Sequence, residues 1–419
     1  MDKKKKVVIL GAGFGGFAAA REFNWLSKWL PGVDITIVDQ NNYHLFVPLL
    51  YMVCAGGIDP ESICFPLRSH LRNGGTVSPI MFRECKVESV DFENRRLIAD
   101  RLELPYDYLV FAPGSHTNFY GIPDIEPHVF ELKTIRDGMS VHNRILECFE
   151  TALLETDEQR RRFQLTFVIV GGGPTGVETA CMISAFIFKS LVRDFHSLTK
   201  LAKIVMVEAT GTLLGGSRPE IAKIAYERLT CCGVEVMLGC PAAKVTTEGI
   251  HMKDGRFVSA RTVLWGAGVR ADPLAAPMPA DKAKDGRVLI NQNLEVPKIP
   301  GLYVIGDCAY REQPDSTRAY PPTAQVALRQ GKACARNIAN HVLGRQQEPF
   351  RYKFKGDLIF LGRNHAVGEI GNMVIKGFPA FAIYELYYLT RLMGFKNKLT
   401  TLIDWAYDYF YERNTVKLG

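Results

Sequence analysis

The chain has 419 residues, of which 47% are hydrophobic and 23% charged, as is ordinary for a globular protein of two or three domains with ample core. Its net charge of +7 is modest, and the lysines of residues 3–6 are interpreted as a solvated arm, so no nucleic-acid partner is predicted. These lysines lead directly into an apolar strand, which argues against a signal or transit peptide. The ten cysteines contain no C-x-x-C pair, so no metal site is predicted. The adjacent Cys231 and Cys232 are interpreted as structural rather than redox-active.

The first predicted element is an apolar strand, residues 7–10, that runs into a glycine-rich turn and a helix-like stretch. Gly11, Gly13 and Gly16 form the pattern G-x-G-x-x-G. In this pattern the first glycine makes a tight turn, the second lets the backbone approach a pyrophosphate, and the third lets the helix pack closely on the strand. The next predicted strand ends in Asp39, whose carboxylate can accept hydrogen bonds from ribose hydroxyls. The pattern predicts a dinucleotide site.

A second copy of this pattern lies further along the chain, behind another apolar strand. Its glycines are Gly171, Gly173 and Gly176, and the strand after the crossover ends in Glu208. The interval to Glu208 exceeds the usual spacing of about 20 residues, and a long helical stretch over 177–200 is predicted to fill it. A carboxylate at Glu208 repels a 2′-phosphate, so NAD(H) is favoured over NADP(H). Two copies in one chain predict two bound dinucleotides.

After the second copy the chain returns to a buried strand that ends in Gly306 and Asp307. This order predicts an α/β fold in which one Rossmann-like dinucleotide-binding domain is inserted in another. The predicted parts are a discontinuous first domain of residues 1–120 and 276–345, a linker or helical segment at 121–162, a second domain at 163–275, and a C-terminal segment at 346–419. The order resembles that of the two-dinucleotide flavoprotein disulfide reductases. That resemblance implies FAD in the first domain and NAD(H) in the second, with Asp307 at the ribityl and phosphate groups of the flavin.

A narrower resemblance rests on residues 320–331, Y-P-P-T-A-Q-V-A-L-R-Q-G, which are similar to a segment of the type II NADH dehydrogenases. Residues 42–44, 114–123 and 361–368 also resemble that family. The resemblance implies non-covalent FAD, NADH as substrate, and a quinone, ubiquinone or menaquinone, bound at Pro322, Thr323 and Gln325. The residues themselves fit this interpretation, because Pro322 can open a helix. An amide at Gln325 can then bond a quinone carbonyl without bringing charge into an apolar site.

Glu178 follows the second fingerprint by two residues. The resemblance implies that it lies beside the nicotinamide and flavin rings as a catalytic residue, where burial could raise its pKa and let it relay a proton. The alternative is a glutamate in the first helical turn that stabilises the helix N-terminus. Both interpretations stay open from the sequence.

The C-terminal segment predicts two amphipathic helices, over about 378–395 and 399–413. The second has a helically spaced apolar face of Leu399, Leu402, Ile403, Ala406, Tyr409 and Phe410. Flanking Trp, Tyr, Lys and Arg residues suit the surface of a bilayer rather than its interior. A peripheral membrane protein is therefore expected, at the cytoplasmic face of a bacterial inner membrane and as a homodimer. The alternative is a core helix or a dimer interface.

Together these features predict an NADH:quinone oxidoreductase that transfers a hydride from NADH to FAD and two electrons to a membrane quinone, without pumping protons. Three alternatives compete with this prediction. A sulfide:quinone oxidoreductase requires reactive cysteines at the flavin, and no evident pair exists among Cys148, Cys181, Cys308 and Cys334. A soluble disulfide reductase requires a close pair, where this chain has Cys54 and, ten residues later, Cys64. The third is an NAD-binding signalling flavoprotein of the apoptosis-inducing type.

Overall fold

The computed structural model describes residues 4–71, 80–100, 102–314, 316, 318–354, 356–411 and 415–417. Contacts between residues divide the chain into two compact units. The first unit consists of residues 1–44, 65–116 and 269–354, and the second of residues 45–64, 117–268 and 355–419. The second fingerprint thus lies in an insertion, as predicted. The ranges 45–64, 121–162 and 355–419 belong to the second unit because their helices and strands pack against the helices and strands of that unit.

The first unit is built on a five-stranded parallel sheet of order β20-β9-β1-β2-β5. The strands are β1 (Lys5–Leu10), β2 (Val33–Asp39), β5 (Ile80–Glu84), β9 (Tyr108–Phe111) and β20 (Leu302–Val304). The last four residues of β1 are all buried, as expected for a parallel strand covered on both faces. The helices of this unit are α1 (Phe14–Leu26), α3 (Leu67–Leu71) and α9 (Ala324–Val342).

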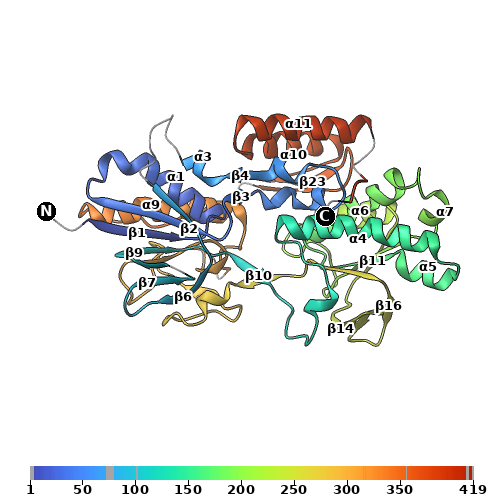
Figure 1. Cartoon of the computed structure of the whole chain (residues 1–419), viewed down its shortest axis with the longest axis horizontal. Helices are drawn as coiled ribbons and strands as arrows, with labels where there is room; N and C mark the ends of the chain where they lie inside the picture. Colours follow the sequence, from blue (N-terminus) through green and yellow to red (C-terminus); the bar gives the residue numbers. More distant parts are fainter. Residues whose placement is uncertain are drawn as a thin grey trace. The chain divides into compact units, whose positions relative to one another are not determined.

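Helices α1 and α9 lie side by side in the first unit (Figure 1). Their close approach depends on a glycine, because a Cβ at Gly331 would collide with the carbonyl oxygen of Gly15. The remaining strands are short, and β6 (Val87–Asp91), β7 (Arg96–Ala99) and β8 (Leu102–Pro105) form an antiparallel sheet. Two-stranded sheets pair β10 (Ser115–Thr117) with β18 (Val269–Ala271), β19 (Val288–Leu289) with β21 (Ala309–Tyr310), and β3 (Tyr43–Leu45) with β4 (Cys64–Pro66).

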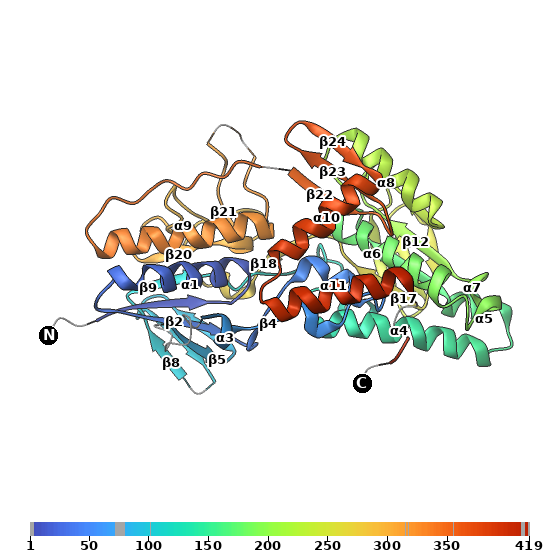
Figure 2. The same ribbon diagram turned by 90° about the horizontal axis from the view of Figure 1, so that it is seen from above.

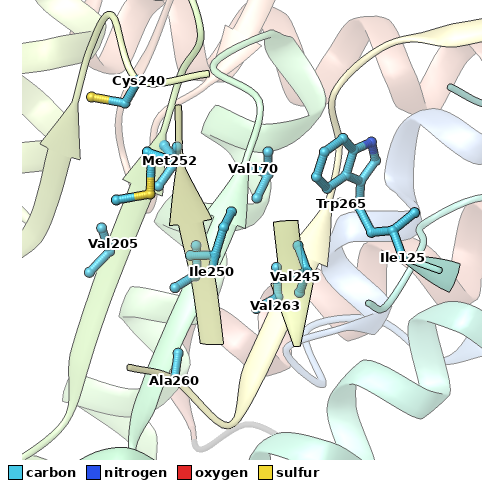
Figure 3. Close-up of a cluster of buried hydrophobic side chains, with 12 residues drawn as sticks. Ile125, Val170, Val205, Cys240, Val245, Ile250, Met252, Ala260, Val263 and Trp265 are labelled. Atoms are coloured by element: carbon cyan, nitrogen blue, oxygen red, sulfur yellow. The ribbon is translucent and has the colours of Figure 1, made fainter. Parts of the chain in front are cut away.

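The second unit has a four-stranded parallel sheet of order β13-β12-β11-β17. Its strands are β11 (Thr166–Val170), β12 (Lys203–Val207), β13 (Val234–Met237) and β17 (Thr262–Trp265). An antiparallel sheet of β14 (Ala242–Thr246), β15 (Gly249–Met252) and β16 (Phe257–Ser259) contributes to the same core. Figure 3 shows this core, in which Val170, Val205 and Val263 of the parallel strands lie with Ile250 of β15 and Trp265.

Helices of the second unit include α2 (Leu50–Val53), α4 (Ile135–Leu154), α5 (Glu158–Gln164), α6 (Pro174–Ala185), α7 (His196–Thr199) and α8 (Pro219–Cys231). A capping box of Thr134 and Asp137 fixes the start of α4. The predicted long helical stretch at 177–200 is interrupted, because α6 passes into a π-helical turn, η5 (Phe186–Ser190), before α7 begins.

The C-terminal part of the second unit begins with an antiparallel sheet of β22 (Gly356–Phe360), β23 (Ala366–Ile370) and β24 (Met373–Lys376). Two helices follow, α10 (Gly377–Arg391) and α11 (Phe395–Phe410), as predicted. Figure 2 shows them next to each other.

Candidate functional site

The first fingerprint forms a cradle at the start of α1. Gly11 has φ +93°, and a Cβ there or at Gly16 would collide with a backbone carbonyl oxygen, of Ala112 or of Gly11 respectively. A Cβ at Gly13 would meet nothing within 4 Å. The protein thus leaves no room for a side chain at Gly11 and Gly16, whereas the backbone at Gly13 is accessible. A pyrophosphate needs to approach the backbone at this second glycine of the motif.

The second fingerprint has the same geometry in the second unit. Gly171 has φ +108°, a Cβ at Gly176 would collide with the Gly171 carbonyl oxygen, and a Cβ at Gly173 would meet nothing within 4 Å. Neither α1 nor α6 has a side-chain N-cap or an acidic residue in its first turn. Their N-terminal N–H groups and positive dipole ends are therefore suited to phosphate groups, and the residues present fit one dinucleotide in each unit.

The two predicted ribose acids occupy equivalent positions. Asp39 Oδ2 accepts a hydrogen bond from the Ala12 N–H at 2.7 Å, and Glu208 Oε2 accepts one from the Gly172 N–H at 2.6 Å. The other oxygen of Glu208 accepts from the backbone and hydroxyl of Thr210, each at 2.7 Å. Each carboxylate is thus fixed at the middle residue of G-x-G, and it keeps further lone pairs for a ribose hydroxyl.

Gly306 and Asp307 lie where β20 ends, in the short helix η7 (Gly306–Cys308). Gly306 has φ +70°, and its N–H donates to Oε1 of Gln330, a buried side chain of α9, at 2.7 Å. The Ser115 hydroxyl donates to Asp307 Oδ2 at 2.6 Å. Because β1, β9 and β20 are parallel neighbours, these groups and the first fingerprint share one edge of the sheet, where ligands of such folds bind.

The predicted quinone-site residues surround the start of α9. Thr323 is the N-cap, and its hydroxyl accepts a bond from the Val326 N–H at 3.4 Å, so the helix opens after Thr323 and the exposed Pro322 precedes the cap instead of starting the helix. Gln325 lies half-buried in the first turn.

A tyrosine of the first unit holds the Gln325 amide. The Tyr352 hydroxyl donates to Gln325 Oε1 at 3.2 Å. The Arg329 guanidinium lies 4.9 Å from the centre of the Tyr352 ring. It also donates a hydrogen bond to the backbone carbonyl oxygen of Gln325 at 3.2 Å. The Gln325 side-chain oxygen is thus directed to Tyr352.

Glu178 lies at the fifth residue of α6, beyond the first turn, and its side chain is buried. The interpretation of Glu178 as a first-turn helix charge is therefore wrong. Its Oε1 accepts hydrogen bonds from the Phe360 N–H at 3.1 Å and from the Tyr384 hydroxyl of α10 at 3.4 Å. Tyr384 shares a further bond, 2.7 Å between hydroxyl oxygens, with Tyr51 of α2. A buried acid is thus linked to two buried phenols within the second unit.

Burial dominates the electrostatics of this cluster. The pKa of Glu178 is raised to about 8, mainly because the carboxylate loses its hydration there and to a smaller extent because of the charge of Asp357. The bonds from the Phe360 N–H and the Tyr384 hydroxyl act in the opposite direction. Burial also raises the pKa of Tyr384 well above its ordinary value. At neutral pH Glu178 is consequently a neutral acid.

Helix α11 carries polar side chains on its buried face. Asn397 Nδ2 donates to the carbonyl oxygens of Glu61, Ser62 and Cys64 at 3.0–3.1 Å, and Trp405 Nε1 donates to Met52 Sδ at 3.3 Å. The predicted apolar face points to solvent: the exposed fraction is 49% for Leu402, 56% for Ile403 and 76% for Phe410. Helix α11 is therefore buried on one face, which includes Asn397, Thr401 and Trp405, and exposed on its predicted apolar face. No helix in the described parts of the chain is long and apolar enough to cross a membrane.

The site residues fall into two groups. The first unit contains Gly11, Gly13, Gly16, Asp39, Gly306, Asp307, Pro322, Thr323 and Gln325, and the second contains Gly171, Gly173, Gly176, Glu178 and Glu208. The sequence did not indicate the polar groups that hold these residues, namely Gln330, Tyr352, Tyr384 and Tyr51. Gln330 belongs to the segment of residues 320–331 on which the family resemblance rests. Its position five residues after Gln325 was the one feature of the sequence that could have indicated its role.

Comparison with known proteins agrees with this arrangement. Residues 5–331 match the family model of the pyridine nucleotide-disulphide oxidoreductases. The type II NADH:quinone oxidoreductase Ndh of Mycobacterium tuberculosis is 32% identical, over 98% of this chain and 89% of that protein. A structure of NDH2 from Plasmodium falciparum in complex with NADH has the same fold, with a TM-score of 0.90 at 20% identity over 99% of this chain and all of that one.

The sulfide:quinone oxidoreductase of Aquifex aeolicus shares the fold less closely, with a TM-score of 0.72 at 16% identity over 99% of this chain and 96% of that one. Of the cysteines weighed for that activity, Cys308 is buried and donates to the Gly114 carbonyl oxygen, and burial raises its pKa. The match along the whole chain and the two fingerprints place it among the pyridine nucleotide-disulphide oxidoreductases, as a member of the type II NADH:quinone oxidoreductase family.

Proposed function

We propose that this protein is an FAD-dependent NADH:quinone oxidoreductase that oxidises NADH and reduces a membrane quinone without pumping protons. The observation that carries the proposal is the presence of two complete, uncapped dinucleotide cradles, one in each unit. Membership of the family supports the same activity. The direct test is whether NADH bleaches, and a quinone restores, the visible absorbance of the purified protein.

In this proposal the predicted domain at 1–120 and 276–345 holds FAD, and the one at 163–275 holds NADH. Asp39 accepts from the adenosine ribose of FAD and Asp307 from its ribityl side, while α1 receives the pyrophosphate. When bound, FAD supplies the acceptor for the hydride and the donor of two electrons. The chain's own residues orient the two nucleotides and supply protons.

Glu178 is the proposed proton donor for quinone reduction, which consumes two protons. Both of its hydrogen bonds reach Oε1, so the proton of the neutral acid resides on Oε2. After Glu178 has given up that proton, the Tyr384 hydroxyl stabilises the carboxylate. Tyr51 in turn bonds Tyr384, so the three groups form a short path for reprotonation.

Glu208 is proposed to select NADH over NADPH through charge repulsion and a bond to the 2′-hydroxyl. Glu208→Gln should keep an oxygen for Gly172 or Thr210 but remove the charge. We expect the free-energy difference that favours NADH over NADPH to fall by about 1–3 kcal/mol, which is the contribution of a charge-assisted hydrogen bond. Steady-state kcat/KM with the two nucleotides measures it. Glu235→Gln, which removes an exposed charge paired with Lys203, is the control. An unchanged ratio in Glu208→Gln would argue against this role.

Gln325 is proposed to form a hydrogen bond with a quinone carbonyl through its side-chain amide, which the Tyr352 hydroxyl contacts. Gln325→Ala should slow reoxidation of the reduced enzyme by quinone about tenfold to hundredfold, since one or two hydrogen bonds are lost, and leave reduction by NADH unchanged. Tyr352→Phe removes the hydroxyl that donates to Gln325 Oε1, so it should raise KM for quinone severalfold with a smaller change in kcat. Stopped-flow measurement of the two half-reactions separates these effects. Slower reduction by NADH in Gln325→Ala would exclude the assigned position.

The exposed apolar face of α11 is proposed to sit in the headgroup region of a bilayer, at the cytoplasmic face of a bacterial inner membrane. Deleting the tail is a poor test, because Tyr384 and Trp405 belong to the buried core. Leu402→Glu with Ile403→Glu should instead weaken binding to anionic vesicles at least tenfold, since burying each side chain is worth about 1.5–3 kcal/mol. Leu154→Glu, at a residue 85% exposed on α4, is the control. Vesicle flotation measures binding.

A homodimer is the competing use of the same face. Sedimentation velocity of the Leu402→Glu, Ile403→Glu variant without lipid tests it. A change from dimer to monomer with vesicle binding intact would assign the face to a second copy and contradict the membrane proposal.

A further inference from the structure

A buried histidine of the first unit contacts the first fingerprint, and the proposed function does not use it. His44 lies on the short strand β3, and its side chain is only 1% exposed. Its Nδ1 donates to the carbonyl oxygen of Ala12, the middle residue of G-x-G, at 2.9 Å. The N–H of Ala12 donates to Asp39 Oδ2 at 2.7 Å. Both backbone polar groups of Ala12 are thus held by side chains, 27 and 32 positions further along the chain.

The second fingerprint holds its middle residue in the same way, with a different donor. The Gly172 N–H donates to Glu208 Oε2 at 2.6 Å, and the Gly172 carbonyl oxygen accepts from the backbone N–H of Leu214 at 2.8 Å. In each unit an acid accepts from the N–H of the middle residue, and a donor binds its carbonyl. The donor in the first unit is a side chain, so a substitution can remove it.

The bond to the Ala12 carbonyl fixes the direction of the next N–H group. That carbonyl and the Gly13 N–H belong to one peptide group, which is planar and trans, so the two point in opposite directions. The carbonyl is turned towards a buried side chain. Gly13 is exposed, and beyond the adjacent residues of the chain a Cβ there would meet nothing within 4 Å. The Gly13 N–H is consequently directed to the open side of the cradle, where a phosphate oxygen can accept from it.

Aromatic rings hold the imidazole of His44 in this orientation. Phe17 stacks on it, with 5.1 Å between ring centres and 15° between planes, and Phe14 meets it edge-on at 4.9 Å. A carbonyl oxygen only accepts, so Nδ1 carries the proton of the neutral ring. Nε2 is buried without a hydrogen-bond partner in the described parts of the chain, and burial lowers the pKa of His44 to about 4. The donor is therefore rigid and uncharged at neutral pH.

We propose that His44 is a positioning residue of the FAD site, which holds the Ala12–Gly13 peptide so that the Gly13 N–H faces the pyrophosphate. This inference rests on the proposed assignment of FAD to the first unit. Without the imidazole, the Ala12 carbonyl would be a buried acceptor that has lost its donor. The peptide would then rotate towards another donor and turn the Gly13 N–H away from the phosphate. In this role His44 acts through the backbone and not on the reacting atoms of the flavin.

Two substitutions separate the hydrogen bond from the packing. His44→Asn places an amide N–H near the position of Nδ1 but removes the ring that stacks on Phe17. His44→Leu fills more of the space and donates nothing. Each full-length holoprotein is diluted, and the rise of flavin fluorescence measures the release of FAD. His44→Leu should release FAD about three- to tenfold faster than the wild type, the factor of one net hydrogen bond, and His44→Asn should stay within about twofold.

Phosphorus NMR of the bound FAD gives a second readout, independent of activity. The pyrophosphate resonances should shift in His44→Leu and keep their positions in His44→Asn. His142→Leu is the control, because it removes a buried histidine that stacks on Phe186 in the second unit. It should release FAD at the wild-type rate.

A packing role predicts the opposite order of the two variants, because leucine replaces the volume of the ring better than asparagine does. Faster release from His44→Asn than from His44→Leu, or pyrophosphate resonances unchanged in both, would overturn the proposal. If His44→Leu does not fold, His44→Asn decides the question: slow release with unshifted resonances supports the hydrogen bond, and fast release contradicts it. A wild-type protein without FAD would contradict the proposed function itself, whereas a failure of the variants alone leaves that function intact.

Discussion

Gly13→Val is expected to give a folded protein that purifies without flavin, whereas Gly173→Val should stay yellow and lose its affinity for NADH. Both glycines have extended backbone angles, φ −64° and −76°, that valine adopts without strain. Beyond the adjacent residues of the chain, a Cβ at either position meets nothing within 4 Å. The added side chain therefore obstructs only what approaches the cradle. Losing the bonds between backbone N–H groups and a pyrophosphate should cost about 3 kcal/mol or more, which is at least hundredfold in affinity.

The measurements are the flavin-to-protein absorbance ratio of each purified variant and the NADH concentration that half-saturates reduction in a stopped-flow instrument. Circular dichroism and a thermal melt serve as the fold control. Gly176→Ala offers a contrast, because its Cβ would collide with the Gly171 carbonyl oxygen and should destabilise the second unit itself. Loss of flavin from Gly173→Val, with retention in Gly13→Val, would reverse the assignment of the two units.

Glu178→Gln is expected to remove a pH dependence from both activity and stability. The folded chain keeps a proton on Glu178 up to about pH 8, whereas the unfolded chain releases it near the ordinary value of 4.5. The wild-type free energy of unfolding should therefore fall as pH rises from 4.5 to 8 and level off above 8. At 1.36 kcal/mol per pKa unit the loss is on the order of 5 kcal/mol. Glutamine keeps an oxygen for Phe360 and Tyr384 but does not titrate.

Urea denaturation at pH 5 and at pH 8.5 measures this effect. The variant should resemble the wild type at pH 5 and exceed it by several kcal/mol at pH 8.5. Turnover with quinone should decline in the wild type as pH passes 8, because the donor is then deprotonated, and should be low and without that inflection in the variant. Glu147→Gln, at an exposed ion pair of α4, is the control. Equal wild-type and variant stability at both pH values would show that Glu178 is ionised in the folded protein.

The fingerprints were predictable from sequence because each is a local pattern of glycines behind an apolar strand, with an acid at the end of the next strand. The insertion of one unit in the other followed from the order of those patterns. The two C-terminal helices were predicted from the sequence, and the apolar face of α11 that was interpreted as suited to a bilayer surface is exposed. That α11 is buried on its own unit through Asn397 and Thr401 was not predicted.

The residues that contact the site residues could not be predicted from local sequence patterns. Tyr384 lies 206 positions from Glu178, and Tyr51 lies 333 positions from Tyr384. Tyr352 contacts Gln325 from 27 positions away, beyond the end of helix α9. Nothing in the spacing of these residues indicates a contact, since tertiary packing alone brings them together.

The central claim is that one chain carries electrons from NADH through FAD to a quinone. Its most direct test is an anaerobic stopped-flow titration of the purified full-length protein, preceded by acid precipitation to identify the released flavin. Yellow FAD should appear in the supernatant. One equivalent of NADH should bleach the bound flavin, and one equivalent of a short-chain quinone should restore its absorbance. A covalently retained flavin, FMN in the supernatant, or a bleached enzyme that quinone fails to reoxidise would contradict the account.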